Sequence, residues 1–168
     1  MAGGVPLDPA RKVLTRDEAR RWREQRTGAV VFTNGVFDVL HRGHVAYLAR
    51  ARAEGDALVV GVNTDASARR LGKGPDRPVN AGQDRAFVLA GLECVDAVVL
   101  FDEDTPLELI RRIGPDVLVK GGDWEPDRIV GADVVRKSGG TVRSLSFEGG
   151  YSTTSIVERI RRTAPRRG

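Results

Sequence analysis

Cysteine is almost absent from this chain of 168 residues, which contains one, Cys94. A disulfide within the chain is therefore excluded, and the sequence suits a reducing compartment. Cys94 is flanked by Leu92, Val95 and Ala97. We interpret it as a small core residue and not as a nucleophile.

Long apolar runs are missing too. No segment approaches the ~18–20 consecutive apolar residues that a membrane span requires, and no secretory signal is recognised. We therefore expect a cytoplasmic protein that makes no membrane contact. The composition, 40% hydrophobic and 30% charged, is typical of a globular protein, and the length fits one domain.

Aromatic residues make up only 5% of the chain, and the net charge is a mild +4. Arginines nevertheless gather in two stretches, which are Arg20, Arg21, Arg23 and Arg26 near the start and Arg159, Arg161, Arg162, Arg166 and Arg167 at the end. Solvated helix faces and a basic tail explain such runs more simply than nucleic acid does. Few aromatic side chains lie among them, which further disfavours single-strand binding.

Five buried, β-rich segments alternate with helical ones. They cover residues 29–33, 57–62, 95–101, 117–119 and 141–145. Helices are predicted between them at 43–54, in the segment 66–82, and at 83–92, 104–113 and 127–137, with a last helix after Ser152. This alternation predicts an α/β fold, a Rossmann-like, doubly wound sheet of five parallel strands.

The segment before residue 29 is expected to be an N-terminal extension. Residues 1–14 are expected to be loosely attached, and the capping-box pattern from Thr15 to Glu18 predicts one helix that closes near Gly28. The main domain is then 29–163, and 164–168 is a basic tail.

In such a sheet ligands bind beyond the carboxyl ends of the strands, near the topological switch. The predicted strands end in polar, glycine-rich segments at 34–44, 63–65, 120–124 and 147–154. We expect these four segments to meet at one site.

The turn at 33–44, Thr-Asn-Gly-Val-Phe-Asp-Val-Leu-His-Arg-Gly-His, carries the strongest signal. His41 and His44 are the only histidines of the chain and share one face of a helix's first turn, where free N–H groups attract anions. Gly43 lets a ligand approach the backbone. Capping histidines or metal ligands are the alternatives, but there is no Cys/His cluster, and we predict no metal held by side chains.

Two common phosphate cradles are absent. The first strand is not followed by G-x-G-x-x-G, which disfavours hydride chemistry, and the chain has no G-x-x-x-x-G-K-[ST].

The turn resembles the H-x-G-H region of the cytidylyltransferase-like nucleotidyltransferases. The resemblance continues in order through Gly61–Asp65, Arg77–Asn80, Asp84-Arg85, Val95-Asp96, Asp104–Pro106, Lys120–Trp124 and Tyr151–Thr154. Together these motifs resemble the bacterial heptose 1-phosphate adenylyltransferases, or ADP-heptose synthases, over about residues 29–162.

That resemblance implies transfer of the adenylyl group of ATP to D-glycero-β-D-manno-heptose 1-phosphate, with Mg²⁺ accompanying ATP. It implies a separate heptose kinase as pathway partner, a role in heptose-containing surface glycans such as lipopolysaccharide core, and a homodimer as one expectation, with the N-terminal helix as its interface.

The resemblance also implies roles for individual residues. His41, His44, Lys73 and Arg85 would act on the reacting phosphates, Lys73 from a glycine-flanked loop. The remaining substrate-binding residues would be Thr33, Asn34, Gly35, Phe37, Asp38, Gly43, Asp65, Lys120, Gly121, Asp123, Trp124, Ser152, Thr153 and Thr154. Asp38 and Asp65 would orient the acceptor or a Mg²⁺ ion. Plainer interpretations stay open: a solvent lysine at 73, a salt bridge at Arg85, turn or cap aspartates at 38 and 65, and N-caps at 152–154.

Three other functions are consistent with these residues. The chain could be a cytidylyltransferase for another phosphorylated acceptor such as glycerol 3-phosphate, a nucleotide-binding module without catalysis, or an RNA-binding fragment driven by its arginines. The first is disfavoured because 147–151 lacks the arginine that the glycerol-phosphate branch carries before its Ser-Thr-Thr.

Overall fold

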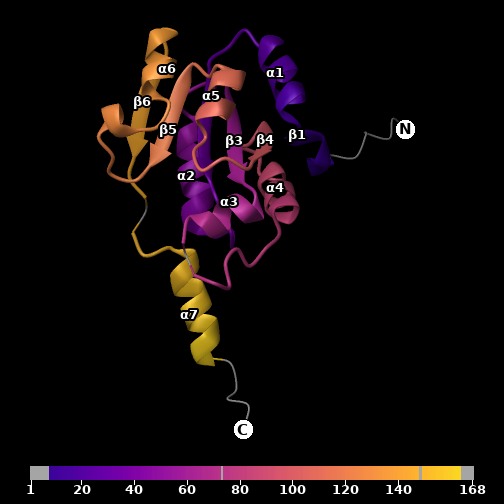
Figure 1. Cartoon of the computed structure of the whole chain (residues 1–168), viewed down its shortest axis with the longest axis vertical. Coiled ribbons are helices and arrows are strands. Elements are labelled where there is room, and N and C mark those ends of the chain that lie inside the picture. Colours follow the sequence, from indigo (N-terminus) through magenta and orange to yellow (C-terminus); the bar gives the residue numbers. More distant parts are fainter. Residues whose placement is uncertain (1–7, 73, 148, 164–168) are drawn as a thin grey trace.

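Strands and helices alternate through the computed structural model, which describes residues 8–72, 74–147 and 149–163 (Figure 1). The strands are β1 (Val13–Leu14), β2 (Val30–Gly35), β3 (Ala57–Asn63), β4 (Ala97–Phe101), β5 (Val117–Gly121) and β6 (Thr141–Leu145). They form one sheet in the order β1-β4-β3-β2-β5-β6, and every neighbouring pair is parallel. The predicted α/β class with a parallel, Rossmann-like sheet is confirmed, but the sheet has six strands and not five.

The additional strand comes from the segment that was expected to be loosely attached. A 3₁₀ helix, η1 (Pro9–Lys12), leads into β1, which pairs with Val98 and Val99 at the sheet edge. Lys12 Nζ donates a hydrogen bond of 2.8 Å to the Val95 carbonyl. For residues 8–14 that expectation was therefore wrong, because two residues are too few to show a strand's alternation. Residues 1–7 lie outside the described residues, and the domain boundaries after 28 and 163 stay predictions.

The α-helices are α1 (Arg16–Glu24), α2 (Arg42–Arg52), α3 (Asp65–Arg70), α4 (Gly82–Ala90), α5 (Leu107–Ile113), α6 (Ala132–Lys137) and α7 (Thr153–Thr163). The capping box predicted at α1 is present, since Thr15 and Glu18 exchange backbone and side-chain hydrogen bonds. The helix predicted over 127–137 is split into a 3₁₀ turn, η2 (Pro126–Arg128), and α6. Gly131, with φ +89°, lies between them and interrupts the helix. No helix in the described ranges has the length and apolar character to cross a bilayer.

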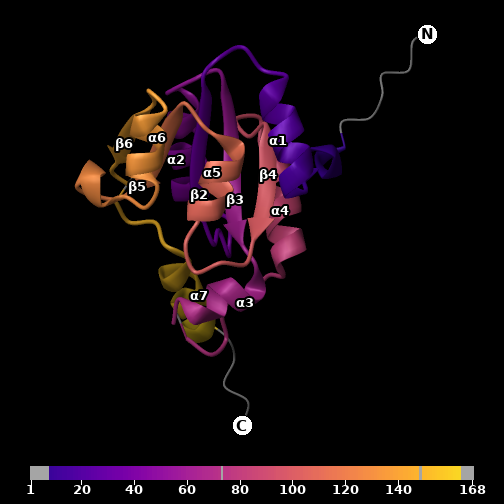
Figure 2. The ribbon, with the colours of Figure 1, turned by 45° about the horizontal axis from the view of Figure 1, so that its top comes forward.

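Two apolar cores lie on opposite faces of the sheet. Along β2, Val30 and Phe32 join the core beneath α1, α5 and α6, whereas Val31 joins the core beneath α2 and α4. Figures 1 and 2 show these helices flanking the sheet. Both faces of the central strands are therefore covered, which explains why the strands are apolar throughout and why the doubly wound prediction agrees with the layers.

The chain reverses its direction of winding at β2. From β2 the chain passes to β3 and β4, toward one edge of the sheet. It then crosses back to β5 and β6, which lie toward the other edge. The boundary between β2 and β5 is the topological switch, where open α/β sheets bind ligands at the strands' carboxyl ends.

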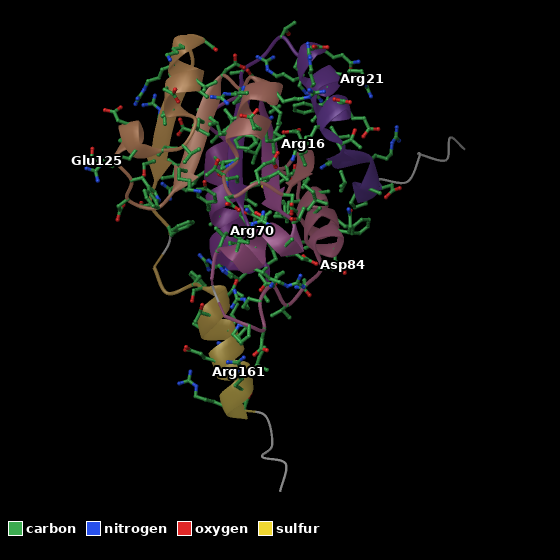
Figure 3. All side chains as sticks on the ribbon, viewed as in Figure 1. Arg16, Arg21, Arg70, Asp84, Glu125 and Arg161 are labelled. Carbon is green, nitrogen blue, oxygen red and sulfur yellow. The ribbon has the colours of Figure 1, made fainter. Side chains whose placement is uncertain are left out.

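Several arginines near the two ends of the chain are paired with acids. Arg16, labelled in Figure 3, bonds both carboxylate oxygens of Glu103, and Arg23 bonds Asp116. Helix α7 extends beyond the body of the domain in Figures 1 and 2. Its Arg161 pairs with Asp76 at 2.9 Å.

Candidate active site

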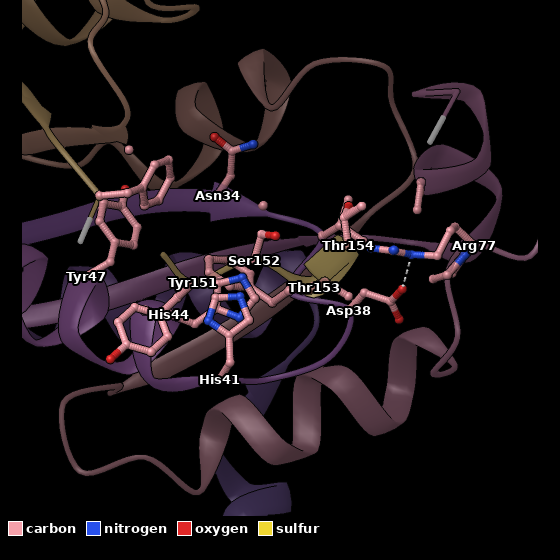
Figure 4. A pocket seen from close by; sticks show the side chains of 18 of the residues that line it. Asn34, Asp38, His41, His44, Tyr47, Arg77, Tyr151, Ser152, Thr153 and Thr154 are labelled. Atoms are coloured by element: carbon pink, nitrogen blue, oxygen red, sulfur yellow. Dashed lines mark hydrogen bonds and ion pairs between the residues drawn. The ribbon is translucent and has the colours of Figure 1, made fainter. Parts of the chain in front are cut away.

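A cavity of about 640 Å³ opens at the carboxyl ends of β2 and β5 (Figure 4). Four stretches of the chain line it, namely the β2–α2 turn, the α3–α4 segment, the end of β5, and the loop that enters α7. The residues predicted from sequence that line it are Asn34, Gly35, Phe37, Asp38, His41, Gly43, His44, Lys120, Gly121, Ser152, Thr153 and Thr154. The expectation that the histidines and the 152–154 hydroxyls share one cavity is confirmed.

Unusual backbone geometry shapes the turn between β2 and α2. Phe37 has φ +49°, a left-handed conformation that costs free energy for a residue with a side chain. His41 has extended backbone dihedrals and occupies the N-cap position of α2, without a side-chain capping bond. The start of α2, with its positive dipole end, therefore faces the cavity.

The two imidazoles are stacked. Their ring centroids are 3.8 Å apart with an interplanar angle of 21°, and the Phe37 ring meets His44 edge-on at 5.2 Å. Burial lowers the pKa of His41 below its usual value, because the cavity wall disfavours the imidazolium form. His41 Nδ1 has no hydrogen-bond partner within the described part of the chain. That nitrogen is itself buried in the wall, so its hydrogen-bonding capacity is unused in this structure.

Gly43 lines the cavity and also makes room for a contact that the sequence did not predict. A Cβ placed there would lie 2.8 Å from Cβ of Tyr151 and 3.1 Å from Cε1 of His41. The loop before α7 lies against the glycine through Tyr151. Gly43 thereby brings the two helix starts together.

The start of α7 forms another wall of the cavity. The Ser152 hydroxyl accepts a hydrogen bond from the Ser155 N–H at 3.1 Å, so Ser152 caps the helix as the plainer interpretation held. The Thr153 hydroxyl is turned inward and donates to the Val39 carbonyl at 3.3 Å, whereas Thr154 is exposed. The N-terminal amides of α7 and the Thr154 hydroxyl thus remain as candidate anion contacts.

Lys120 and Asn34 connect the two strand ends at the switch. Lys120 Nζ donates to the Asn34 side-chain oxygen at 3.4 Å, and both residues line the cavity. Lys120 therefore places a positive charge where β2 and β5 meet.

Five of the predicted site residues do not line the cavity. Thr33 is fully buried, and its hydroxyl lies 2.6 Å from the Tyr47 hydroxyl. Trp124 is half exposed and donates from Nε1 back to the Gly121 carbonyl at 3.1 Å, after a turn in which Gly122 has φ +109°. Asp123, in the same turn, is exposed and is not part of the cavity wall.

Arg85 and Asp65 are the other two, and they form an ion pair in which the guanidinium is buried and the Asp65 side chain is 34% exposed. Arg85 was predicted beside the phosphates, but its side chain is 0% exposed and is not among those that line the cavity. Its guanidinium donates to the carbonyls of Asn80, Val36 and Asn63 and to Asp65 Oδ1, at 2.6–3.0 Å. Lys73 lies outside the described residues.

The sequence interpretation did not select the remaining wall residues, which are Val36, Tyr47, Ala68, Arg77, Pro78, Phe147 and Tyr151. Arg77 stood within a quoted motif without a role. The Phe147 ring covers Gly121, whose missing Cβ makes room for it, and packs near Tyr47 with ring centroids 5.3 Å apart. The only signal for these wall residues in the sequence was a glycine at the end of a strand with isolated aromatic residues after it.

The described residues contain no cluster of metal-binding side chains. No group of three or more His, Cys, Asp or Glu side chains within them is placed to hold a metal. Asp38 is the one carboxylate among the described lining residues, and its oxygens accept hydrogen bonds from Arg77 Nε and from the N–H groups of Val79 and Asn80. Both oxygens of this carboxylate are thus already engaged by protein donors.

Known proteins resemble this chain over most of its length. A protein named bifunctional protein HldE from Syntrophotalea carbinolica is 59% identical over 138 residues, which are 82% of this chain and 28% of that protein. The HldE protein of Wolinella succinogenes is 54% identical over 89% of this chain and 31% of its own length. The chain thus spans about three tenths of the length of these curated relatives.

Solved structures share the fold. The lipopolysaccharide core biosynthesis protein from Thermoplasma volcanium superposes with a TM-score of 0.59 and 30% identity, over 74% of this chain and 99% of that one. Pantothenate synthetase from Thermus thermophilus has a TM-score of 0.55 at 21% identity, over 86% and 67% of the two chains, which shows the fold alone. The model of the cytidylyltransferase-like family matches residues 32–159, the segment that builds every wall of the cavity, and this chain therefore belongs to that family.

Proposed function

We propose that this chain is a nucleotidyltransferase that moves the adenylyl group of ATP to D-glycero-β-D-manno-heptose 1-phosphate, giving ADP-heptose and pyrophosphate. The observation that carries the proposal is the convergence of the stacked histidines, Lys120 and the start of α7 on one cavity. Family membership supports the reaction class. The motif set and the relative titled as a lipopolysaccharide core biosynthesis protein support the sugar and its use in surface glycan.

The reaction needs no activated protein nucleophile. An oxygen of the sugar phosphate attacks the α-phosphorus of ATP, the bond from that phosphorus to the bridging oxygen breaks, and pyrophosphate leaves with the electron pair. No proton has to be removed from an anionic phosphate, so the protein's task is to align the two substrates and offset their charge.

The cavity contains groups suited to that task. His41 and His44 lie in its wall and can donate hydrogen bonds to the α-phosphate as charge develops. The starts of α2 and α7 both open onto the cavity and contribute positive dipole ends. Lys120 adds a full charge beside Asn34, and Lys73 is proposed to contact the β- and γ-phosphates.

The test is turnover with matched substrates. The protein is incubated with ATP or CTP, each with heptose 1-phosphate or glycerol 3-phosphate, and pyrophosphate release is followed. We expect release with ATP and the heptose phosphate. Release only with CTP and glycerol phosphate would assign the chain to the cytidylyltransferase alternative, and nucleotide binding without release in any pair would support a non-catalytic module.

Two partners belong to the proposal. A sugar kinase must supply the 1-phosphate, and the relatives of this chain carry the name bifunctional. A homodimer through α1 is a further expectation, which light scattering on the purified protein would test. Mg²⁺ is proposed to arrive with the triphosphate and not to occupy a site of its own.

A further inference from the structure

Arg77 is held rigidly in the cavity wall. It belongs to the segment between α3 and α4, and only 16% of its side chain is exposed. Its Nε donates to Asp38 Oδ2 at 2.6 Å, and Figure 4 shows this contact as a dashed line. Asp38 is itself fixed, because its other oxygen accepts from the N–H groups of Val79 and Asn80. The guanidinium is therefore anchored at one edge.

The other edge of the guanidinium faces the cavity. Nη1 and Nη2 of Arg77 make no hydrogen bond to any of the described residues, although Arg77 lines the cavity. A guanidinium presents a planar fork of donors that matches two oxygens of a phosphate. An Nε bound to a carboxylate and an unused Nη pair form an anion receptor whose orientation is already set.

The rest of the wall makes Arg77 the natural candidate for this task. Among the described lining residues it is the one arginine, and Lys120 is the other full positive charge. Figure 4 shows Arg77 beside Asp38, with Tyr47 toward the opposite end of the view and the histidine rings between them. Arg85, to which the sequence interpretation gave the phosphate contact, is sealed below the wall.

We propose that Arg77 binds, through its Nη pair, a phosphate group flanking the one that is transferred. The ligand is a phosphate with at least two free oxygens, supplied either by the pyrophosphate portion of the nucleotide or by the phosphomonoester of the acceptor. This inference rests on the proposed function, and it adds a substrate-binding residue that the motif comparison left without a role.

The matched variants are Arg77→Lys, Arg77→Ala and Arg69→Ala. Lysine keeps the charge and can still pair with Asp38, but it lacks the fork. Arg69 is exposed on α3 and lies outside the cavity lining, so its variant is the control. For each protein we would measure melting temperature, KM for each substrate, and calorimetric binding of inorganic pyrophosphate and of the sugar 1-phosphate separately.

We expect Arg77→Lys to melt close to the control while binding of one of the two ligands weakens roughly 10- to 100-fold, as loss of a charge-assisted contact implies. Weaker pyrophosphate binding with a raised KM for ATP identifies the nucleotide as the source. Weaker sugar phosphate binding identifies the acceptor.

Three outcomes would overturn the inference. One is a lysine variant that binds both ligands like the control. Another is restoration of every parameter by lysine after loss in Arg77→Ala, which would make Arg77 only a support for Asp38. The third is an unsubstituted protein that binds neither ligand. If pyrophosphate binding depends on Arg77 but the unsubstituted protein shows no turnover, the proposed reaction is refuted and the anion site at Arg77 is supported.

Discussion

Replacing Arg85 by Met removes a buried guanidinium but keeps a side chain of similar length. Four hydrogen bonds of 2.6–3.0 Å are lost, three of them to backbone carbonyls. Those carbonyls belong to the turn after β2, the end of β3 and the approach to α4, so several buried acceptors lose their donor together. Breaking such a charged network costs about 3–5 kcal/mol, a large part of the roughly 5–15 kcal/mol that stabilises a domain.

That loss should lower the melting temperature by roughly 6–20 °C for a chain of this size. Differential scanning calorimetry of Arg85→Met measures it, and Arg69→Met, on the exposed side of α3, is the control and should change little. Loss of turnover alone does not distinguish a supporting role of Arg85 from a catalytic one, because a displaced β2–α2 turn also impairs the site. A variant that melts like the control but has lost turnover would refute the supporting role and return Arg85 to the chemistry.

Three further predictions concern the wall between α2 and α7. Gly43→Ala should cut turnover at least about tenfold, because the new methyl group would lie 2.8 Å from Cβ of Tyr151. The same substitution should change the free energy of unfolding by no more than about 2 kcal/mol. His44→Ala should lower kcat about 10²- to 10³-fold at an unchanged melting temperature, and an unaltered kcat would discredit its role. Burial lowers the pKa of His41, so the unfolded chain binds more protons than the folded chain just below pH 6.5. The free energy of unfolding should therefore fall as pH decreases through that range. Denaturant titrations at several pH values should show a weaker pH dependence for His41→Asn than for the unsubstituted protein.

The sheet was predictable because its strands are buried on both faces. Segments such as 57–63, which is buried throughout, leave an apolar run that glycine and polar residues terminate. The edge strand β1 was not predictable, since two residues carry no alternation and their pairing with Val98 and Val99 depends on tertiary context. The break in the 127–137 helix required the left-handed Gly131, and a glycine alone does not reveal its dihedral angle.

The location of the site was predictable for a topological reason, whereas several of its contacts were not. Polar turns that follow parallel strands meet at one edge, which brought the β2–α2 turn and the end of β5 together. A sequence does not say which carbonyls will converge on an arginine, so the burial of Arg85 could not be inferred. Nor does it say that the turn at Gly122 directs Trp124 back onto the Gly121 carbonyl.

The charge balance of the cavity indicates how its histidines would respond to substrate. Asp38 and Arg77 offset each other, Lys120 is the other full charge among the described lining residues, and burial keeps His41 toward its neutral form. A polyphosphate brings several negative charges, and an anion beside an imidazole favours its protonation. We therefore expect binding of a phosphate-bearing ligand in the cavity to be accompanied by proton uptake at His41.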